Sequence, residues 1–536
     1  MSKEIYDKFY QKYGVEIHND PMRFIAIKNL CRGDVLDIGC GTGDLADYYQ
    51  GNYTGIDISE VAIKMARKRE IPNARFYEGD PTQPLNTETR KFDTIIMAEF
   101  LEHLKDEGEL FNNIRKWIAD DGRIIISVPN GDRVPDENHF REFTIPEMRK
   151  RFSSLGKIKF YNWDGAKHRI LATIDLNKKN EDILSLVMIV KNEEKGLEKA
   201  ILSAIEFTDN IVISVDKESE DKTLEIAKLY ADTLKQHQWK DDFAAARNFA
   251  KEGVTSKWIL SLDGHEYVEK AEGIEEKLKA EESCLMIQVK MENGDTFHTP
   301  RIFRSNIEWK HAIHNAIKCD SMAKYSEFII RHDRTGGQNR QAIIKRKEQR
   351  DEMMPRLLKK ELREDKKSLR ALFYLARWYF TAGKMKKAVK YYKKYLRGGG
   401  PKGERWYCAF ELAISQNALA RPLRALKALE IAEKEVPNRW ETSKLIGLTY
   451  MSFGRWRKAV NYLVDSFKIN TGDFAFYPME RNDAETWDLI GFCFFQMKNY
   501  KQARIAWEES IKKDEDPERI KLNKRRIELI DKKQFF

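Results

Sequence analysis

A short apolar run leads directly into a loop with glycine at every second position. Residues 35–43 read Val-Leu-Asp-Ile-Gly-Cys-Gly-Thr-Gly, and a second apolar run, 53–56, is followed by Asp57. Glycine has no Cβ, so its backbone turns sharply and approaches a ligand closely. A carboxylate at the tip of the next strand accepts hydrogen bonds from both hydroxyls of a ribose. The pattern predicts a sheet that holds a nucleoside-type cofactor at the carboxyl ends of its strands.

The following segments narrow the type of cofactor. A third strand near 75–80 ends in Asp80, and a fourth, 92–98, is followed by Glu-Phe-Leu-Glu-His. With G-x-G-x-G after Asp37, this series resembles the class I S-adenosylmethionine-dependent methyltransferases over about residues 1–175. A Rossmann-like domain that binds NAD, or no cofactor, is the alternative, since similar glycine loops mark NAD sites.

The resemblance assigns roles to residues of this sequence. It implies that the S-adenosylmethionine contacts are the glycines and acids at the strand ends, namely Asp37, Gly39, Gly41, Gly43, Asp57 and Asp80. The donor methyl group is already activated, so alignment of the acceptor matters most. A general base helps if the acceptor is a hydroxyl. His103 is the candidate base, and a packing or hydrogen-bonding role at a helix start is its alternative.

Composition limits the class of protein. The 536 residues predict three or four domains, and 95 basic against 85 acidic residues give an interspersed net charge of +10, which does not favour nucleic acid as a partner. The six cysteines stand singly, so we expect neither a zinc knuckle nor a disulfide framework. Cysteines without such pairs are typical of a reduced, cytoplasmic setting, which we therefore expect for this chain. No run of eighteen apolar residues exists, so no transmembrane segment is expected.

A second α/β pattern begins at Leu184 and continues to about 335. Its apolar strands 184–190, 211–215 and 258–262 are joined by Asp-Asp-Phe-Ala-Ala-Ala-Arg-Asn at 241–248 and Asp-Gly-His-Glu at 263–266. The ordered series resembles family 2 glycosyltransferases of GT-A fold, especially the branch related to peptide glycosyltransferases. The resemblance implies that a nucleotide sugar is bound by Asn192, Glu193, Asp216 and Arg247.

Sugar transfer releases a diphosphate, whose charge a divalent cation neutralises, and oxygen ligands suit Mg²⁺ or Mn²⁺. The family supplies them with Asp-x-Asp, and here Asp263 takes the first position while His265 replaces the second acid. The replacement shifts the metal preference or signals a lost activity. In the closing segment, Asn315 stands where relatives often carry Glu, so a base at that place is in doubt, and His314 is a candidate for metal or phosphate binding.

After residue 368 the pattern changes to helix pairs. Equivalent alanines at 388, 425, 459 and 503 are spaced by 37, 34 and 44 residues, and the basic period of 34 matches the tetratricopeptide repeat. The sequence thus predicts a methyltransferase domain at 1–178, a glycosyltransferase domain at 183–335, a charged and partly helical linker at 336–368, and an all-α repeat solenoid at 369–536.

Three functions follow from this organisation. The first is a bifunctional enzyme that transfers a methyl group and a sugar to one glycan or glycoconjugate. The second is an interaction scaffold with a degenerate glycosyltransferase fold, whose repeats recruit a protein partner. The third is a glycosyltransferase that uses the repeats to bind a peptide acceptor. The sugar, the nucleotide, the acceptor and the oligomeric state are left open, since fold does not fix substrate.

Overall fold

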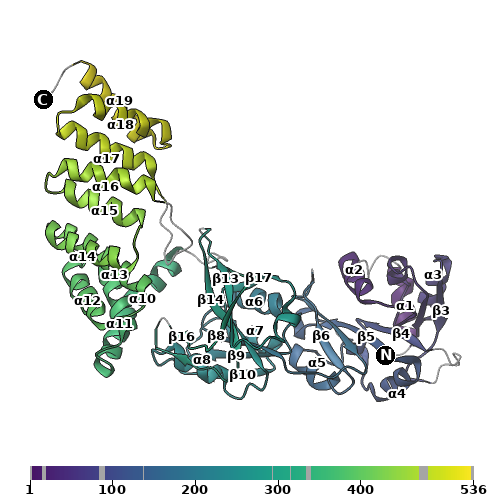
Figure 1. The fold of residues 1–536 in the computed structure, drawn as a ribbon. Helices are drawn as coiled ribbons and strands as arrows, with labels where there is room; N and C mark the ends of the chain where they lie inside the picture. Colours follow the sequence, from purple (N-terminus) through teal and green to yellow (C-terminus); the bar gives the residue numbers. More distant parts are fainter. Residues whose placement is uncertain are drawn as a thin grey trace. The chain divides into compact units, whose positions relative to one another are not determined.

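The computed structural model describes residues 3–14, 20–83, 91–136, 138–163, 165–292, 294–313, 315–333, 340–469 and 481–532. The chain forms two compact units, Met1–Ile343 and Ile344–Phe536. The first unit holds two large sheets and one small two-stranded sheet, and the second is built from helices (Figure 1). The fold class predicted from the sequence, two α/β domains and an all-α repeat region, is confirmed.

The first sheet has seven strands in the order β3-β2-β1-β4-β5-β7-β6. The strands β1 to β5 are parallel, and β7 pairs antiparallel with both β5 and β6. Their bounds are Val35–Ile38, Tyr53–Asp57, Ala74–Glu78, Phe92–Ala98, Ile118–Pro129, Lys157–Phe160 and Arg169–Asp175 for β1 to β7. The runs are apolar on both faces because helices cover a parallel sheet on both sides.

The helices of this domain are α1 (Lys3–Tyr13), α2 (Pro21–Leu30), α3 (Glu60–Lys68), α4 (Gly108–Trp117) and α5 (Ile145–Phe152). Short 3-10 helices are η2 (Asp44–Tyr48), η3 (Leu101–His103) and η4 (Gly131–Arg133). The start of α5 follows the sequence rule for a helix cap: Thr144 accepts a hydrogen bond from the backbone N–H of Glu147.

The second sheet has eight strands in the order β10-β9-β8-β11-β14-β13-β17-β12. The parallel part consists of β8 (Leu184–Val190), β9 (Asn210–Asp216), β10 (Thr233–His237) and β11 (Trp258–Asp263). The mixed part consists of β12 (Glu266–Ala271), β13 (Cys284–Lys290), β14 (Thr296–Arg304) and β17 (Met322–His332), and β15 (Trp309–Lys310) pairs with β16 (Ala316–Ile317). The helices are α6 (Leu197–Ala204), α7 (Thr223–Tyr230), α8 (Phe243–Lys251) and α9 (Ile274–Lys277).

The two sheet domains share buried polar contacts. Asn130 Nδ2, after β5, donates to the hydroxyl of Tyr230 on α7 at 3.0 Å, and both residues are fully buried. Arg149 Nε on α5 donates to Asp232 Oδ1 at 2.8 Å. Arg133 pairs with Glu198 on α6. These contacts explain why both predicted catalytic domains fall in one compact unit. The predicted domain boundaries themselves stay predictions.

One cysteine expectation is wrong. Cys284, at the start of β13, and Cys319, after β16, form a disulfide with Cα atoms 6.1 Å apart, a separation that suits such a bond. They stand 35 residues apart in sequence, and only the pairing of β13 with β17 brings them together. The solitary spacing of the cysteines therefore gives no ground for a reducing compartment. Among the described residues no helix combines the length and apolarity needed to cross a membrane.

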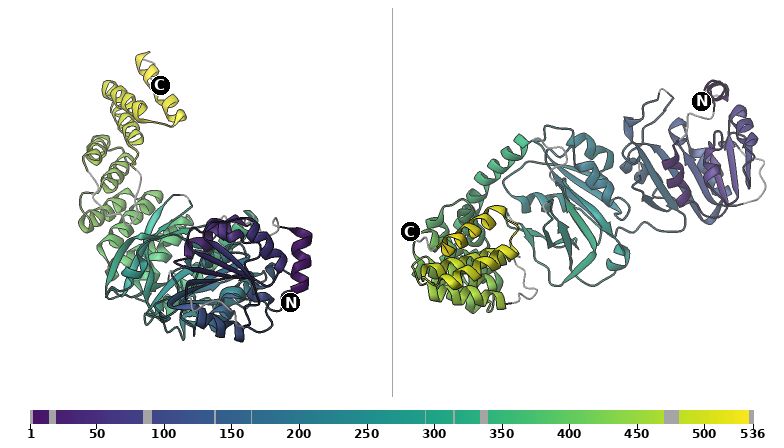
Figure 2. Two further views of the ribbon diagram at one scale, coloured as in Figure 1. Left: turned by 90° about the vertical axis from the view of Figure 1, so that its right-hand side faces the viewer. Right: turned by 90° about the horizontal axis from the view of Figure 1, so that it is seen from above.

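The second unit is a series of helix pairs, which Figure 2 displays from two further sides. The helices are α10 (Arg340–Glu364), α11 (Leu369–Thr381), α12 (Met385–Gly398), α13 (Lys402–Ala418), α14 (Pro422–Glu435), α15 (Trp440–Met451), α16 (Trp456–Lys468), α17 (Asp483–Gln496), α18 (Tyr500–Lys513) and α19 (Pro517–Asp531). The repeat alanines 388, 425, 459 and 503 are all fully buried, as their role at helix crossings requires. At Gly491 an added Cβ would lie 2.5 Å from Trp507, so this crossing admits only hydrogen.

Candidate active sites

The first candidate site lies where the strand order of the first sheet reverses. β1 pairs with β2 on one side and with β4 on the other, and ligands bind at such a switch point, beyond the carboxyl ends of the strands. The glycine loop begins directly after β1. Gly39 and Gly41 have φ angles of +75° and +52°, and an added Cβ would lie 2.5 Å from the Phe100 ring and 2.8 Å from the Tyr10 hydroxyl, respectively. Only glycine fits this loop.

Asp57 links the loop to the end of β2. Its Oδ2 accepts a hydrogen bond from the Gly41 N–H at 2.9 Å, and its Oδ1 accepts one from the Ser59 N–H at 2.8 Å. Burial raises the pKa of Asp57, and the two backbone hydrogen bonds counteract the rise. Asp57 is thus fixed beside the loop, as a ribose-binding carboxylate must be. Gly43, also at positive φ, closes the loop against Phe76.

The carboxyl groups of Asp37 and Asp80 lie in different environments. Asp37 is buried beneath the loop, where Tyr53 donates its hydroxyl proton to Oδ2, and burial raises the pKa of Asp37 to about 7. Asp37 therefore supports the loop from within the sheet. Asp80 lies just beyond β3 and accepts hydrogen bonds from Thr82 N at 2.9 Å and Oγ1 at 2.7 Å. The backbone bond from Gly79 N to Asp57 O, 3.0 Å, keeps these two strand ends adjacent.

Helix α1 packs against this site. Asp7 accepts hydrogen bonds from Ser59 Oγ at 2.6 Å and Val61 N at 3.2 Å. Tyr10 is buried against Gly41. The neighbouring Tyr6 is also shielded from solvent, and burial, followed by the charge of Asp57, raises the pKa of Tyr6 to about 12. No glycine or acid motif marks these tyrosines, so sequence reasoning missed them.

His103 ends η3, just past β4. Its Nδ1 lies 3.2 Å from the carbonyl oxygen of Asn138, and its ring is 4.9 Å from the ring of His139 between centroids. Burial lowers the pKa of His103. Glu99, at the end of β4, has a φ of +53° and binds Ser127 Oγ and Arg169 Nε, both at 2.9 Å. Glu99 and His139 were not assigned roles from the sequence.

The second candidate site lies at the equivalent reversal, where β8 pairs with β9 and with β11. Asn192, at φ +53°, accepts a hydrogen bond from Glu220 N at 2.8 Å through its side chain. Asp216, at the end of β9, is buried and accepts one from Glu218 N at 2.8 Å. These residues join the loops after β8 and β9, where the resemblance placed a nucleotide.

A charged cluster surrounds Asp263 at the end of β11. Arg247 from α8 donates from Nη2 to Asp263 Oδ1 at 2.6 Å and from Nη1 to Ser261 Oγ at 2.8 Å. Arg301 Nη2 lies 4.0 Å from Asp263 Oδ2 and also pairs with the buried Glu266. Burial alone would raise the pKa of Asp263, but Arg247 and Arg301 hold it well below its usual range. Arg301 and Glu266 are site residues that the sequence did not single out.

His265 lies beside Glu193 and His332. Its Nδ1 is 3.5 Å from Glu193 Oε1, and its ring is 4.5 Å from that of His332. Burial would lower the pKa of His265, but the Glu193 hydrogen bond and the Asp263 charge raise it overall. His314 lies outside the described residues.

The fit of a cation between Asp263 and His265 follows from these contacts. The guanidinium group of Arg247 binds Oδ1 of Asp263, and the guanidinium group of Arg301 lies near Oδ2. Among the described residues, no third carboxylate, thiolate or imidazole joins this pair within metal-ligand range. As arranged, the residues do not fit a metal ion. Their assignment as metal ligands stays a prediction.

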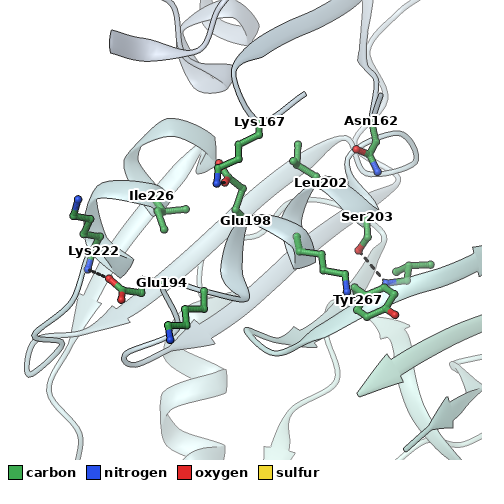
Figure 3. Close-up of a pocket in the computed structure, with 12 residues that line it drawn as sticks. Asn162, Lys167, Glu194, Glu198, Leu202, Ser203, Lys222, Ile226 and Tyr267 are labelled. Carbon is green, nitrogen blue, oxygen red and sulfur yellow. Dashed lines mark hydrogen bonds and ion pairs between the residues drawn. The ribbon is translucent and has the colours of Figure 1, made fainter. Parts of the chain in front are cut away.

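A cavity of about 720 Å³ lies between the two sheet domains (Figure 3). Asn162 and Lys167 line it from the first domain, and the second contributes the polar face of α6 and Tyr267 of β12. Lys199 Nζ lies 3.5 Å from the centre of the Tyr267 ring. None of the residues predicted to bind either donor lines this cavity, so it is separate from both candidate donor sites.

Comparison with known proteins assigns both sheets. Residues 10–167 match the family model described as a methyltransferase domain, and residues 185–339 match that of glycosyl transferase family 2. The chain is 35% identical over 117 residues to the mRNA cap guanine-N(7) methyltransferase of Schizosaccharomyces pombe, covering 18% of this chain and 32% of that protein. It is 31% identical over 125 residues to the ubiquinone biosynthesis O-methyltransferase of Glaesserella parasuis, covering 21% and 53%.

The repeats also have a counterpart. A tetratricopeptide repeat-containing protein of Synechococcus elongatus is 39% identical over 83 residues, which is 16% of this chain and 20% of that protein.

Among solved structures, a DhpI complex with SAH matches with a TM-score of 0.28 at 19% identity, covering 33% of this chain and 95% of that one. The chain spans between about a fifth and a half of the length of these curated relatives. The chain thus carries a methyltransferase domain and a family 2 glycosyltransferase domain, together with tetratricopeptide-type repeats.

Proposed function

We propose that this chain transfers a methyl group from S-adenosylmethionine and a sugar from a nucleotide sugar to the same glycan or glycoconjugate. The observation that carries the first activity is the hydrogen bond from Gly41 N–H to Asp57 at 2.9 Å, which fixes a carboxylate beside the positive-φ loop. The loop suits the methionine part of the cofactor, Asp57 its ribose, and Asp80 its adenine. S-adenosylmethionine supplies a methyl group on a sulfonium, and the protein contributes alignment.

The second activity is proposed for the cluster around Asp263. A nucleoside diphosphate leaves with developing negative charge, and fixed cationic groups stabilise that charge without rearrangement. Arg247 and Arg301 supply two such groups at the end of β11. Because Asp263 is strongly acidic, it is a poor general base. We assign it the role of holding both guanidinium groups in place. Asn192, Glu193 and Asp216 would border the nucleotide.

The joint acceptor is supported by the contacts between the two domains. The buried hydrogen bond between Asn130 and Tyr230 and the ion pair between Arg149 and Asp232 hold the domains in one unit. The cavity between them is lined by polar side chains such as Asn162 and Glu198 and by apolar ones such as Leu202 and Ile226, a mixture that a saccharide can contact. The repeats would bind a protein partner or the carrier of the glycan.

The test uses the purified full chain with methyl-labelled S-adenosylmethionine, a panel of nucleotide sugars and Mn²⁺. We expect one product that carries both the label and the added sugar. Two separate products, each with one group, would contradict the joint acceptor while leaving both activities standing. Calorimetry in which neither donor binds would contradict the activities themselves.

One observation favours a second candidate, an interaction scaffold. The carboxylate predicted to bind metal is already paired with Arg247, as in a site that has lost its cation. Under this alternative the glycosyltransferase fold binds a ligand without turnover. Hydrolysis of nucleotide sugars, measured with and without Mn²⁺, separates the candidates: a rate that vanishes in Asp263→Ala supports catalysis, and no turnover in the parent supports the scaffold.

A further inference from the structure

A second group of ligand-type side chains lies in the methyltransferase domain, away from the acidic motif of the glycosyltransferase. The carboxylate of Glu102 and the ring nitrogens of His103 and His139 offer one ligand atom each, all within 4.8 Å of one another. Among the described residues this is the one group of three or more such side chains that meets this criterion. Two imidazoles and a carboxylate form a donor set typical of divalent first-row metals.

Glu102 provides an independent reason to expect a ligand here. Its side chain is 1% exposed, and neither carboxylate oxygen has a hydrogen-bond partner among the described residues. A buried carboxylate without a partner is costly, and such groups are normally paired or bound to a metal. The structure therefore retains an unpartnered carboxyl group within reach of two histidines.

The surrounding contacts orient the ligands. The carbonyl oxygen of Asn138 lies 3.2 Å from His103 Nδ1, so it fixes the proton on Nδ1 and leaves the Nε2 lone pair for an ion. Metal-binding histidines commonly have such a carbonyl partner. The backbone bond from Phe140 N to Glu102 O, 2.8 Å, joins the segment of His139 to that of Glu102. Two chain segments 36 residues apart are thus held together at this point.

The group lies next to the proposed donor site. Phe100, two residues before Glu102, packs against Gly39, and the Tyr6 ring of α1 lies 6.3 Å from the His103 ring between centroids. Three protein ligands leave coordination positions open for another molecule. An open position beside the donor site can take an oxygen of the methyl acceptor.

We propose that Glu102, His103 and His139 bind a divalent first-row metal ion that holds and activates the acceptor hydroxyl for O-methylation. Metal coordination favours loss of the hydroxyl proton, which passes to water. The oxygen then forms a bond to the methyl carbon as the carbon–sulfur bond breaks and its electron pair returns to sulfur. The products are a methyl ether, S-adenosylhomocysteine and a proton. His103 is then a metal ligand and not the base predicted from the sequence.

Ligand chemistry narrows the choice of ion. Imidazole nitrogens favour Fe²⁺, Co²⁺ or Zn²⁺ over Mg²⁺, Ca²⁺ and Mn²⁺, which prefer oxygen ligands. Ligands of a four-coordinate ion lie at about 2.0–2.2 Å from it, so the three side chains must draw closer together than 4.8 Å on binding. Rotation of the side chains supplies this movement, since the backbone bonds around them already fix the two segments.

The binding experiment uses the metal-stripped full chain and Co²⁺, whose visible absorption reports coordination by protein. We expect a saturable band that Glu102→Gln and His139→Gln weaken at least roughly tenfold in affinity. His298→Gln, an exposed histidine on β14, is the matched control and should bind as the parent does. His265→Ala should also retain the band, which places the ion outside the glycosyltransferase domain. A parent without a band, or ligand variants that bind like the control, overturns the proposal.

A thermal measurement guards against misfolded variants. Without metal, Glu102→Gln should unfold close to the temperature of the parent, because a buried amide replaces a buried carboxyl group of the same size. Added Co²⁺ should raise the unfolding temperature of the parent and leave both ligand variants unchanged. An equal shift in the parent and in both variants contradicts this site. If Glu102→Gln does not fold, the half-buried His139→Gln carries the test.

The role of the metal ion in methyl transfer rests on the proposed methyltransferase activity. Separate measurements test the metal site, the cofactor binding and the role of the ion. Calorimetry should detect S-adenosylmethionine binding before and after chelation, since the glycine loop and Asp57 lie outside the metal group. If the cofactor never binds, the proposed function is wrong while the Co²⁺ result stands. If methyl transfer to a saccharide continues at the same rate after chelation, the activating role of the ion is wrong.

Discussion

Arg247 and Asp263 form a close ion pair, with Nη2 of the arginine 2.6 Å from Oδ1 of the carboxylate. The pair joins helix α8 to the tip of β11, at the place where the sequence indicated a metal ligand. Arg247 is nearly buried and also stacks with its guanidinium carbon 4.9 Å from the centre of the Trp309 ring. The site is therefore organised around the fixed positive charge of Arg247, and Asp263 holds that charge in place.

Replacing the acid of this pair should affect both stability and sugar transfer. Asp263→Asn leaves Arg247 without its counter-charge, which we expect to lower the free energy of unfolding by about 1–3 kcal/mol. It should also abolish hydrolysis of the nucleotide sugar, because the guanidinium groups lose their position. Chemical denaturation and a hydrolysis assay measure the two effects. The exposed Glu281→Gln serves as control, and normal turnover by Asp263→Asn would refute the assigned role.

Asp57 should determine the affinity for S-adenosylmethionine. Asp57→Ala removes the acceptor of two backbone N–H groups and the proposed ribose contact. A charged hydrogen bond contributes about 1.5–3 kcal/mol, so the dissociation constant should rise roughly 10- to 100-fold. Isothermal titration calorimetry provides the measurement. Asp121→Ala, at an exposed position away from the loop, should bind the cofactor like the parent. Unchanged affinity in Asp57→Ala would place the ribose elsewhere.

Asp37 should make the first domain less stable as the pH rises. Burial raises its pKa to about 7 in the folded protein, against 3.8 for an unperturbed aspartate. Between these values the unfolded chain has lost the proton that the folded chain keeps, so stability falls by roughly 1.4 kcal/mol per pH unit. The contribution is complete below about pH 4 and is lost as the pH rises through about 7. Asp37→Asn retains the hydrogen bond from Tyr53 and cannot ionise.

Denaturation of parent and Asp37→Asn at several pH values tests this assignment. The stability of the variant should decline less steeply between about pH 4 and 7. Parallel curves for the two proteins would mean that Asp37 is already ionised in the folded state. The comparison isolates Asp37 from Glu102, whose pKa burial also raises and which is present in both proteins.

Gly491 should tolerate no larger residue. In an exposed helix, replacing glycine by alanine stabilises by about 1 kcal/mol. Here the added Cβ would lie 2.5 Å from Trp507, and overpacking of this kind costs about 1–3 kcal/mol. Gly491→Ala should therefore lower the unfolding temperature of the repeat unit and leave S-adenosylmethionine binding unchanged. Gln496→Ala, exposed on the same helix, is the control, and a gain in stability for Gly491→Ala would show that the helices separate freely.

The sequence determined the strands and loops of both candidate sites, since these depend on local patterns. Apolar runs predicted β4 at Phe92–Ala98 and β8 at Leu184–Val190, and the spaced alanines predicted the repeated helix pairs. Local order also located Asp57 and Asp263 at strand ends. Such features follow from residue type and spacing, because strand direction and glycine freedom act within a few residues of chain.

Tertiary structure alone decided which distant groups meet. It brought Arg301 to Asp263, His139 to Glu102 and Cys319 to Cys284, in each case across more than thirty residues. It also joined the two sheet domains through Asn130 and Tyr230, although a polar segment separates them in sequence. The spacing of residue types along the sequence does not predict such pairings. They depend on strand order and helix packing, which are set by burial of the whole core.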